Sequence, residues 1–173
     1  MEAIDNTQIG SETKNEYAGF WVRAAGMMID LSVIAFLFNQ INWQMREQLQ
    51  SYFIIHPDVA DKYADVFGLR VGKYEMATYF SYYISMILSF FLQWLYYAGM
   101  ESSPLKATLG KWAVGAYVTD LDGGRISFAK ATGRYFGKII SGLILGIGYL
   151  MAGFSNDKQA LHDQMAGCFV WRK

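Results

Sequence analysis

The stretch AGFWVRAAGMMIDLSVIAFLFNQI, residues 18–41, decides the fold class of this chain. It is long and apolar enough to cross a bilayer core, which requires about 20 residues of helix. Arg23 lies near one end of the stretch and Asp30 near its middle. Charged side chains inside hydrocarbon are costly and almost always face protein or water. The stretch therefore predicts a membrane helix whose aspartate has a polar partner.

Two more apolar segments follow. Residues 76–100 contain no Asp, Glu, Lys or Arg over 25 positions, and residues 139–156 contain none over 18. Hydrophobic residues make up 53% of the 173, and the formal net charge is zero, which gives no sign of a nucleic-acid surface. We expect an all-α integral membrane protein with three to four membrane-embedded helices, and the lipid bilayer as its first partner.

The polar segments divide the chain into two parts. Residues 1–16 are predicted to form a flexible N-terminal tail, and residues 17–173 one transmembrane domain. A polar connection, 42–75, joins the first two helices, with helical pieces expected before Pro57 and between Asp58 and Phe67.

A small β-hairpin is predicted outside the bilayer, at 116–127. Its sequence AYVTDLDGGRIS turns on Asp122-Gly123-Gly124, and glycine supplies the positive φ of tight hairpin turns. Ser127 is expected to cap the next helix. The strand-like end of the chain, from Cys168 to Trp171, is expected to pair with this hairpin.

Lysine and arginine counts favour one of two topologies. With three full spans, the two faces of the membrane carry seven cations each, a tie that the positive-inside rule does not favour. If the last apolar region instead folds back near residues 146–148, giving helices at about 127–145 and 148–164, the bias becomes ten to four. This arrangement places both termini and residues 101–126 in the cytoplasm, and we prefer it.

Charged residues in and beside the apolar segments are the candidate site. Arg23 and Asp30 are seven positions apart, so they project from nearly the same helix face. Ala24, Ala25 and Gly26 beside them allow a neighbouring helix to approach closely. Lys130, Arg134 and Lys138 form a basic stripe, which either contacts lipid headgroups or turns Arg134 inward to pair with an aspartate.

These motifs resemble the RDD family of membrane proteins, named for an arginine and two aspartates. The segment FWVRAAGMMID supplies Arg23 and Asp30, ATLGKWAVGAYVTDLDGGRISFAKATGR contains Lys111 and Arg134, and QALHDQMAGCFVW contains His162 and Asp163. Cys168 stands where the family pattern leads us to expect threonine. The resemblance implies a bacterial inner-membrane protein, from a family described as transporters of unknown ligands with cation/proton antiport proposed for some members.

Two functions remain open at this point. In the first, the protein exchanges Na⁺ or another small cation for H⁺, and Arg23 or Arg134 holds Asp30 ionised. In the second, the protein is a structural or accessory membrane protein whose charges hold helices or a partner complex together. The sequence has no motif of a hydrolase, a metalloprotease or a nucleotide-binding enzyme, so we expect no enzymatic activity, metal or cofactor. Gly142, Gly146 and Gly153 suggest association into a homo-oligomer. The candidate residues are Arg23, Asp30, Arg134 and Asp163, with Lys111, Lys138 and His162 as secondary members.

Overall fold

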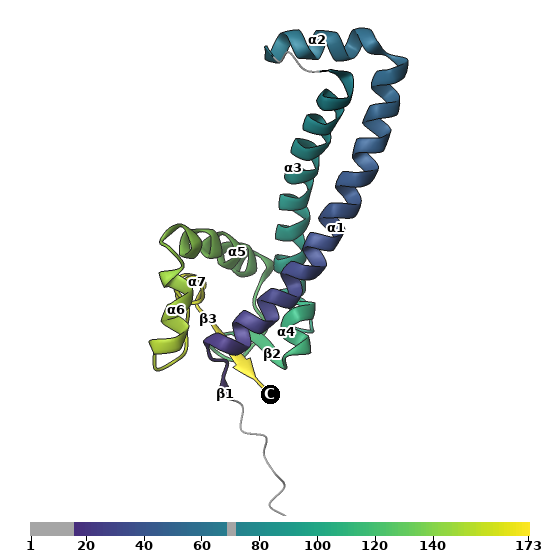
Figure 1. The fold of residues 1–173 in the computed structure, drawn as a ribbon. Helices are drawn as coiled ribbons and strands as arrows, with labels where there is room; N and C mark the ends of the chain where they lie inside the picture. Colours follow the sequence, from purple (N-terminus) through teal and green to yellow (C-terminus); the bar gives the residue numbers. More distant parts are fainter. Residues whose placement is uncertain (1–15, 69–71) are drawn as a thin grey trace, which may run out of the picture. The chain divides into compact units, whose positions relative to one another are not determined.

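The computed structural model describes residues 16–68 and 72–173 (Figure 1). It divides the chain into two compact units: residues 28–97 form one, and the N-terminal residues up to Met27 together with residues 98–173 form the other. The expected tail falls almost wholly on residues 1–15, outside the described residues.

Helix α1, Phe20–Ile55, is a single helix of 36 residues (Figure 1). The predicted end near residue 41 is wrong, because the helix continues through the amphipathic piece of the polar connection. Residues 27–55 contain neither glycine nor proline, so nothing in the backbone interrupts the helix. The helix ends before His56, whose α conformation is disfavoured by the proline that follows.

The unit of residues 28–97 contains an apolar cluster at one end of its helices. Helix α2, Pro57–Phe67, joins α1 to α3, Lys73–Glu101, and matches the piece predicted at 58–67. Phe53 of α1 packs with Met76 and Ala77 of α3, and all three are fully or almost fully buried. Partly buried side chains from the three helices surround them: Leu49, Val59, Ala64 and Phe80.

Large apolar side chains along α1 and α3 remain exposed. Phe36 of α1 is 63% exposed and Ile87 of α3 is 56% exposed, as expected of helices that face lipid. In the described part of the chain, only α1 is long and apolar enough to cross a membrane alone. Helix α3 has no charge from residue 76 to 100, but its many tyrosines and serines make it less apolar.

The predicted hairpin at 116–127 is wrong, although its turn is present. Strand β2, Ala116–Asp120, pairs with β3, Cys168–Arg172, and β3 also pairs with β1, Glu16–Tyr17. Gly123 has a φ of +79°, and Asp120 accepts a hydrogen bond from the backbone N–H of Gly124 at 2.6 Å. Only Arg125 and Ile126 separate this turn from Ser127, the confirmed N-cap of the next helix, so no second strand can form.

The sheet has the order β1-β3-β2 and is antiparallel throughout. The expected pairing of the chain end with residues 116–120 is confirmed, and Val118 lies opposite Val170 with both side chains fully buried. Because β3 is the central strand, the start and end of the described domain lie beside each other (Figure 1).

The last apolar region is broken rather than continuous. Helix α5, Phe128–Leu143, and helix α6, Ile147–Phe154, meet at an angle of 101°. The predicted fold-back lies close to the observed break, but the predicted helix at 148–164 is wrong. Helix α6 has 8 residues, about 12 Å of rise; a separate helix α7, Leu161–Ala166, follows it.

Gly148 allows α6 to lie directly against α5. An added Cβ at this position would come within 2.7 Å of the Ser141 Oγ and 2.9 Å of the Ser141 Cα. Close contact between these two helices therefore requires a residue without a side chain at position 148.

Helix α4, Leu109–Ala113, is a short helix that precedes β2, and Thr108 is its N-cap.

Candidate functional site: a buried network of charges

Six charged side chains form a single buried network in the unit that contains both chain ends. We call it the charge network: Arg23, Glu101, Lys111, Arg134, Lys138 and Asp163. Their side chains are between 0% and 17% exposed. They come from helices α1, α3, α4, α5 and α7, so the network joins segments that are far apart in the sequence.

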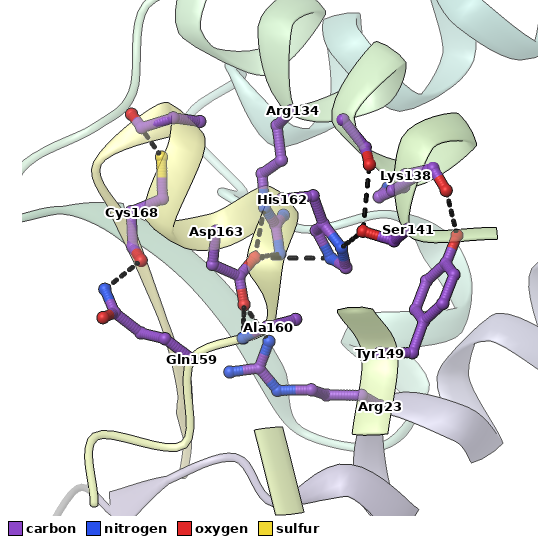
Figure 2. A network of polar contacts seen from close by, with 12 residues as sticks. Arg23, Arg134, Lys138, Ser141, Tyr149, Gln159, Ala160, His162, Asp163 and Cys168 are labelled. Carbon is purple, nitrogen blue, oxygen red and sulfur yellow. Dashed lines mark hydrogen bonds and ion pairs between the residues drawn. The ribbon is translucent and has the colours of Figure 1, made fainter. Parts of the chain in front are cut away.

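Asp163 is at the centre of one half of the network (Figure 2). Arg134 donates to its Oδ1 from Nε at 2.7 Å and from Nη2 at 2.5 Å. Arg23 and the backbone N–H of Ala160 donate to its Oδ2, the latter at 3.1 Å. The contact with Ala160 also fixes the first turn of α7. Both carboxylate oxygens are therefore fully used by protein donors.

Glu101 is at the centre of the other half. Arg134 donates from Nη1 to its Oε2 at 2.7 Å, and so links Glu101 to Asp163. Two ammonium groups share the other oxygen, Oε1: that of Lys111, and that of Lys138 at 3.2 Å. Such charge-assisted hydrogen bonds are stronger than bonds between neutral groups.

Arg23 attaches the start of α1 to the C-terminal segment. Besides Asp163, its guanidinium donates to the backbone oxygen of Ala18 at 2.7 Å and to that of Lys158 at 2.5 Å. Gly26, one turn further along α1, permits a close approach, because an added Cβ would lie 3.2 Å from the backbone oxygen of Gly110. The predicted close packing beside Arg23 is confirmed at this glycine.

The network contains more positive than negative charges. Four cationic side chains face two carboxylates, a formal excess of two positive charges. Burial lowers the pKa of Lys111, and the neighbouring charge of Arg134 lowers it further, to about 7 despite the opposing attraction of Glu101. Loss of the Lys111 proton therefore reduces the excess.

The carboxylate of Asp163 is held ionised. Burial alone would raise its pKa, but Arg134 and Arg23 stabilise the negative charge and hold the pKa of Asp163 well below its usual range. The two guanidinium groups therefore favour the ionised form of this carboxylate at physiological pH.

His162 lies beside Asp163 but serves the packing of α5 against α7. Its Nδ1 lies 3.2 Å from the Ser141 Oγ, and Tyr149 packs against its ring with centroids 5.1 Å apart (Figure 2). Burial lowers the pKa of His162 to about 3, because the attraction of Asp163 is outweighed by desolvation together with the repulsion of Arg134 and two lysines. The imidazole is therefore neutral at physiological pH.

Asp30 lies in the other unit and has a different partner. Its carboxylate is 1% exposed, and the Tyr96 hydroxyl donates to Oδ1 at 2.7 Å. The prediction that Asp30 is buried with a polar partner is confirmed. Both guanidinium groups that were candidates to hold Asp30 ionised bind Asp163, and their pairing with Asp30 stays a prediction.

Sequence reasoning identified most of the network but missed Glu101. The inward turn of Arg134 toward an aspartate is confirmed, and Lys138 joins the same network. Glu101 was overlooked, although it is the first charged residue after the uncharged stretch of α3. Within the described ranges, no group of three His, Cys, Asp or Glu side chains could hold a metal ion.

The fold and this network define a membrane-associated, mostly helical protein. The RDD family model matches residues 17–167, and the chain therefore belongs to the RDD family. The uncharacterized protein YxaI of Bacillus subtilis (strain 168) is 31% identical over 149 residues, which cover 84% of this chain and 91% of that protein. No solved structure matches the chain.

Proposed function

We propose that this protein is a structural or accessory protein of the bacterial inner membrane, whose charge network locks its polar segments into one fixed arrangement. The observation that carries the proposal is the full use of Asp163, which accepts hydrogen bonds from α1, from α5 and from the backbone before α7. A carboxylate occupied in this way has no free oxygen for a transported cation.

The energetics of buried charges support a locking role. A buried ion pair adds little stability over an apolar pair, but removal of one partner leaves an uncompensated charge and costs about 3–5 kcal/mol. The network thus penalises every arrangement in which one of its helices moves away. Its excess of cations also repels Na⁺, which makes it a poor cation site.

The proposal includes a topology. Helices α1 and α3 cross the bilayer, and the broken pair α5–α6 enters it and returns, so that both termini are cytoplasmic. The pairing of β3 with both β1 and β2 supports this arrangement, because the chain end must then share a side with residues 116–120. The excess of lysine and arginine on that side also supports it. The protein is non-enzymatic, and its exposed helix faces associate into a homo-oligomer.

The test compares Asp163→Asn with wild type in two assays. The locking role predicts that purified wild-type protein in vesicles carries no cation-dependent proton movement, and that Asp163→Asn loses thermal stability in detergent. Glu47→Gln, which removes a carboxylate from an exposed position, is the matched control. A variant that folds as stably as wild type, together with cation flux by wild type, would overturn the proposal.

Cation/proton antiport is a second candidate, because Asp30 is a buried carboxylate in α1, the described helix that is long and apolar enough to cross a membrane. The Tyr96 hydroxyl that contacts it could remain in place while a proton and a cation exchange at the carboxylate. Antiport predicts that vesicles with wild-type protein show proton movement driven by Na⁺ or another small cation, and that Asp30→Asn abolishes it at equal protein content. Equal flux in both, or none in wild type, excludes this candidate.

A further inference from the structure

A polar pocket of about 450 Å³ lies on α1 beyond its apolar part. Five residues line it, each with a side chain that can form hydrogen bonds: Asn39, Gln40, Asn42, Trp43 and Arg46. All belong to the unit of residues 28–97, and none belongs to the charge network.

Two groups in the pocket are ready to receive a ligand. The Oδ1 atom of Asn42 is buried and has no hydrogen-bond partner among the described residues. An unsatisfied buried polar atom of this kind costs about 1–3 kcal/mol unless a ligand or water supplies the missing bond. The guanidinium of Arg46 lies over the Trp43 ring, 4.8 Å from its centroid. Stacking uses the face of the guanidinium and leaves its N–H edge available for an oxyanion.

The position of the pocket along α1 indicates the kind of ligand. Apart from Arg23 and Asp30, residues 20–38 are the apolar part of α1, and the polar run begins at Asn39. A span over 20–38 places Asn39 at the edge of the hydrocarbon and Arg46 about 10 Å further out. The headgroup layer of each leaflet adds about 5–8 Å to the core, so Trp43 lies within it, and the Arg46 side chain, which lies over the Trp43 ring, reaches it from just outside. Trp43, which is 54% exposed, is a residue type enriched at this depth.

We propose that this pocket binds the headgroup of an anionic phospholipid. Arg46 binds the phosphate through its N–H edge, while the Asn42 oxygen accepts a hydrogen bond from a hydroxyl of the headgroup. Trp43 holds the guanidinium in place and packs against the glycerol region. The site thus fixes a lipid at the point where α1 leaves the apolar core.

The test measures lipid retention by the full-length protein. Protein purified from nanodiscs that contain phosphatidylglycerol and phosphatidylcholine is examined by native mass spectrometry. We expect wild type to retain phosphatidylglycerol preferentially, and Arg46→Gln and Asn42→Ala to retain about tenfold less. Arg125→Gln, which removes the same charge from an exposed loop, should bind as wild type does.

Three outcomes would overturn the proposal. The first is equal retention of phosphatidylglycerol by Arg46→Gln and wild type. The second is complete displacement of the lipid by millimolar inorganic phosphate, which would indicate a site for free phosphate. The third is conversion of an oligomer into a monomer by Arg46→Gln without a change in lipid retained per chain, which would identify the face as a contact between copies. Circular dichroism of each variant confirms that it is folded before the comparison.

Discussion

Asp163 and Arg134 each form several hydrogen bonds in the charge network. Each is buried almost completely and each bonds more than one element, so neither can be replaced without leaving its partners unpaired. Arg134 bridges the two carboxylates through the fixed fork of its guanidinium, which lysine cannot reproduce. The arginine and two aspartates for which the family is named therefore have different surroundings in this protein. Arg23 and Asp163 belong to the charge network, whereas Asp30 lies in the other unit.

His162 gives the protein a predicted acid sensitivity. The pKa of His162 is lowered to about 3 in the folded protein, from 6.5. Between these two values the unfolded chain binds more protons, so stability rises with pH across this window and is lost as the pH falls from 6.5 toward 3. One such group contributes a slope of up to about 1.4 kcal/mol per pH unit. We expect thermal stability in detergent to decline over this range.

The matched variants are His162→Gln and His56→Gln, since the chain contains only two histidines. His162→Gln should lower the stability at pH 7 but flatten its pH dependence between about pH 5 and 6.5. His56 is exposed, and its replacement should leave the slope unchanged. Identical slopes in wild type and His162→Gln would show that another group is responsible. Below about pH 5 the unfolded chain also protonates Asp163, whose pKa is lowered in the folded protein, so the slopes are compared only between about pH 5 and 6.5.

At the scale of elements, the contact between α5 and α6 depends on one glycine. Gly148→Ala places a methyl group where the Ser141 Oγ and Cα already lie. Overpacking of this kind costs about 1–3 kcal/mol. Gly142→Ala is the control, because an added Cβ there meets nothing within 4 Å. Urea or thermal unfolding should show a loss for Gly148→Ala and little change for Gly142→Ala, and equal effects would contradict the observed packing.

The register of the sheet can be tested by cross-linking. Tyr117 lies opposite Trp171 in the β2–β3 ladder. In a Cys168→Ala background, Tyr117→Cys with Trp171→Cys should form a disulfide on mild oxidation, because directly opposed residues have close Cβ atoms. Tyr117→Cys with Phe169→Cys is displaced by two positions and should cross-link poorly. Preferential cross-linking of the displaced pair would mean a different register.

Sequence patterns predicted the elements better than their partners. The turn at Asp120–Gly124, the Ser127 cap and the strand at the chain end were all recognisable from local chemistry. Strand β2 pairs with β3 because too few residues lie between the turn and the start of α5 to form a second strand of a hairpin. The length of α1 was underestimated because a change from apolar to polar composition does not end a helix, whereas the proline at 57 does.

The charge network was predictable in part for the same reason. Arg23, Arg134 and Asp163 stand out because each is a charge within or beside an apolar segment. Their pairing could not be inferred from the sequence. Arg23 is 140 positions from Asp163, and Arg134 is 29 positions from it, so these side chains meet only through the tertiary fold. Glu101 ends α3 and begins the segment 101–126 that the sequence places in the cytoplasm, so nothing in the sequence indicates its burial between three cations.

At the scale of the whole molecule, the network and the sheet belong to the same unit and support each other. In the sheet, Tyr17 pairs with Trp171 of β3. Arg23, in the first turns of α1, binds Asp163 of α7. The unit of residues 28–97 contains Asp30, exposed apolar side chains of α1 and α3, and the proposed headgroup pocket. Asp30, the candidate for cation exchange, and the charge network therefore belong to different units.

The coupling between Arg23 and Asp163 shows whether the buried charges hold α1 against α7, and a double-mutant cycle measures it. The free energies of unfolding of Arg23→Gln, Asp163→Asn and the double variant are measured in one detergent against wild type. If the buried network locks α1 to α7, the double variant is more stable than the sum of the single losses predicts, with a coupling of about 1–3 kcal/mol. Additive losses, or single variants as stable as wild type, would contradict the account.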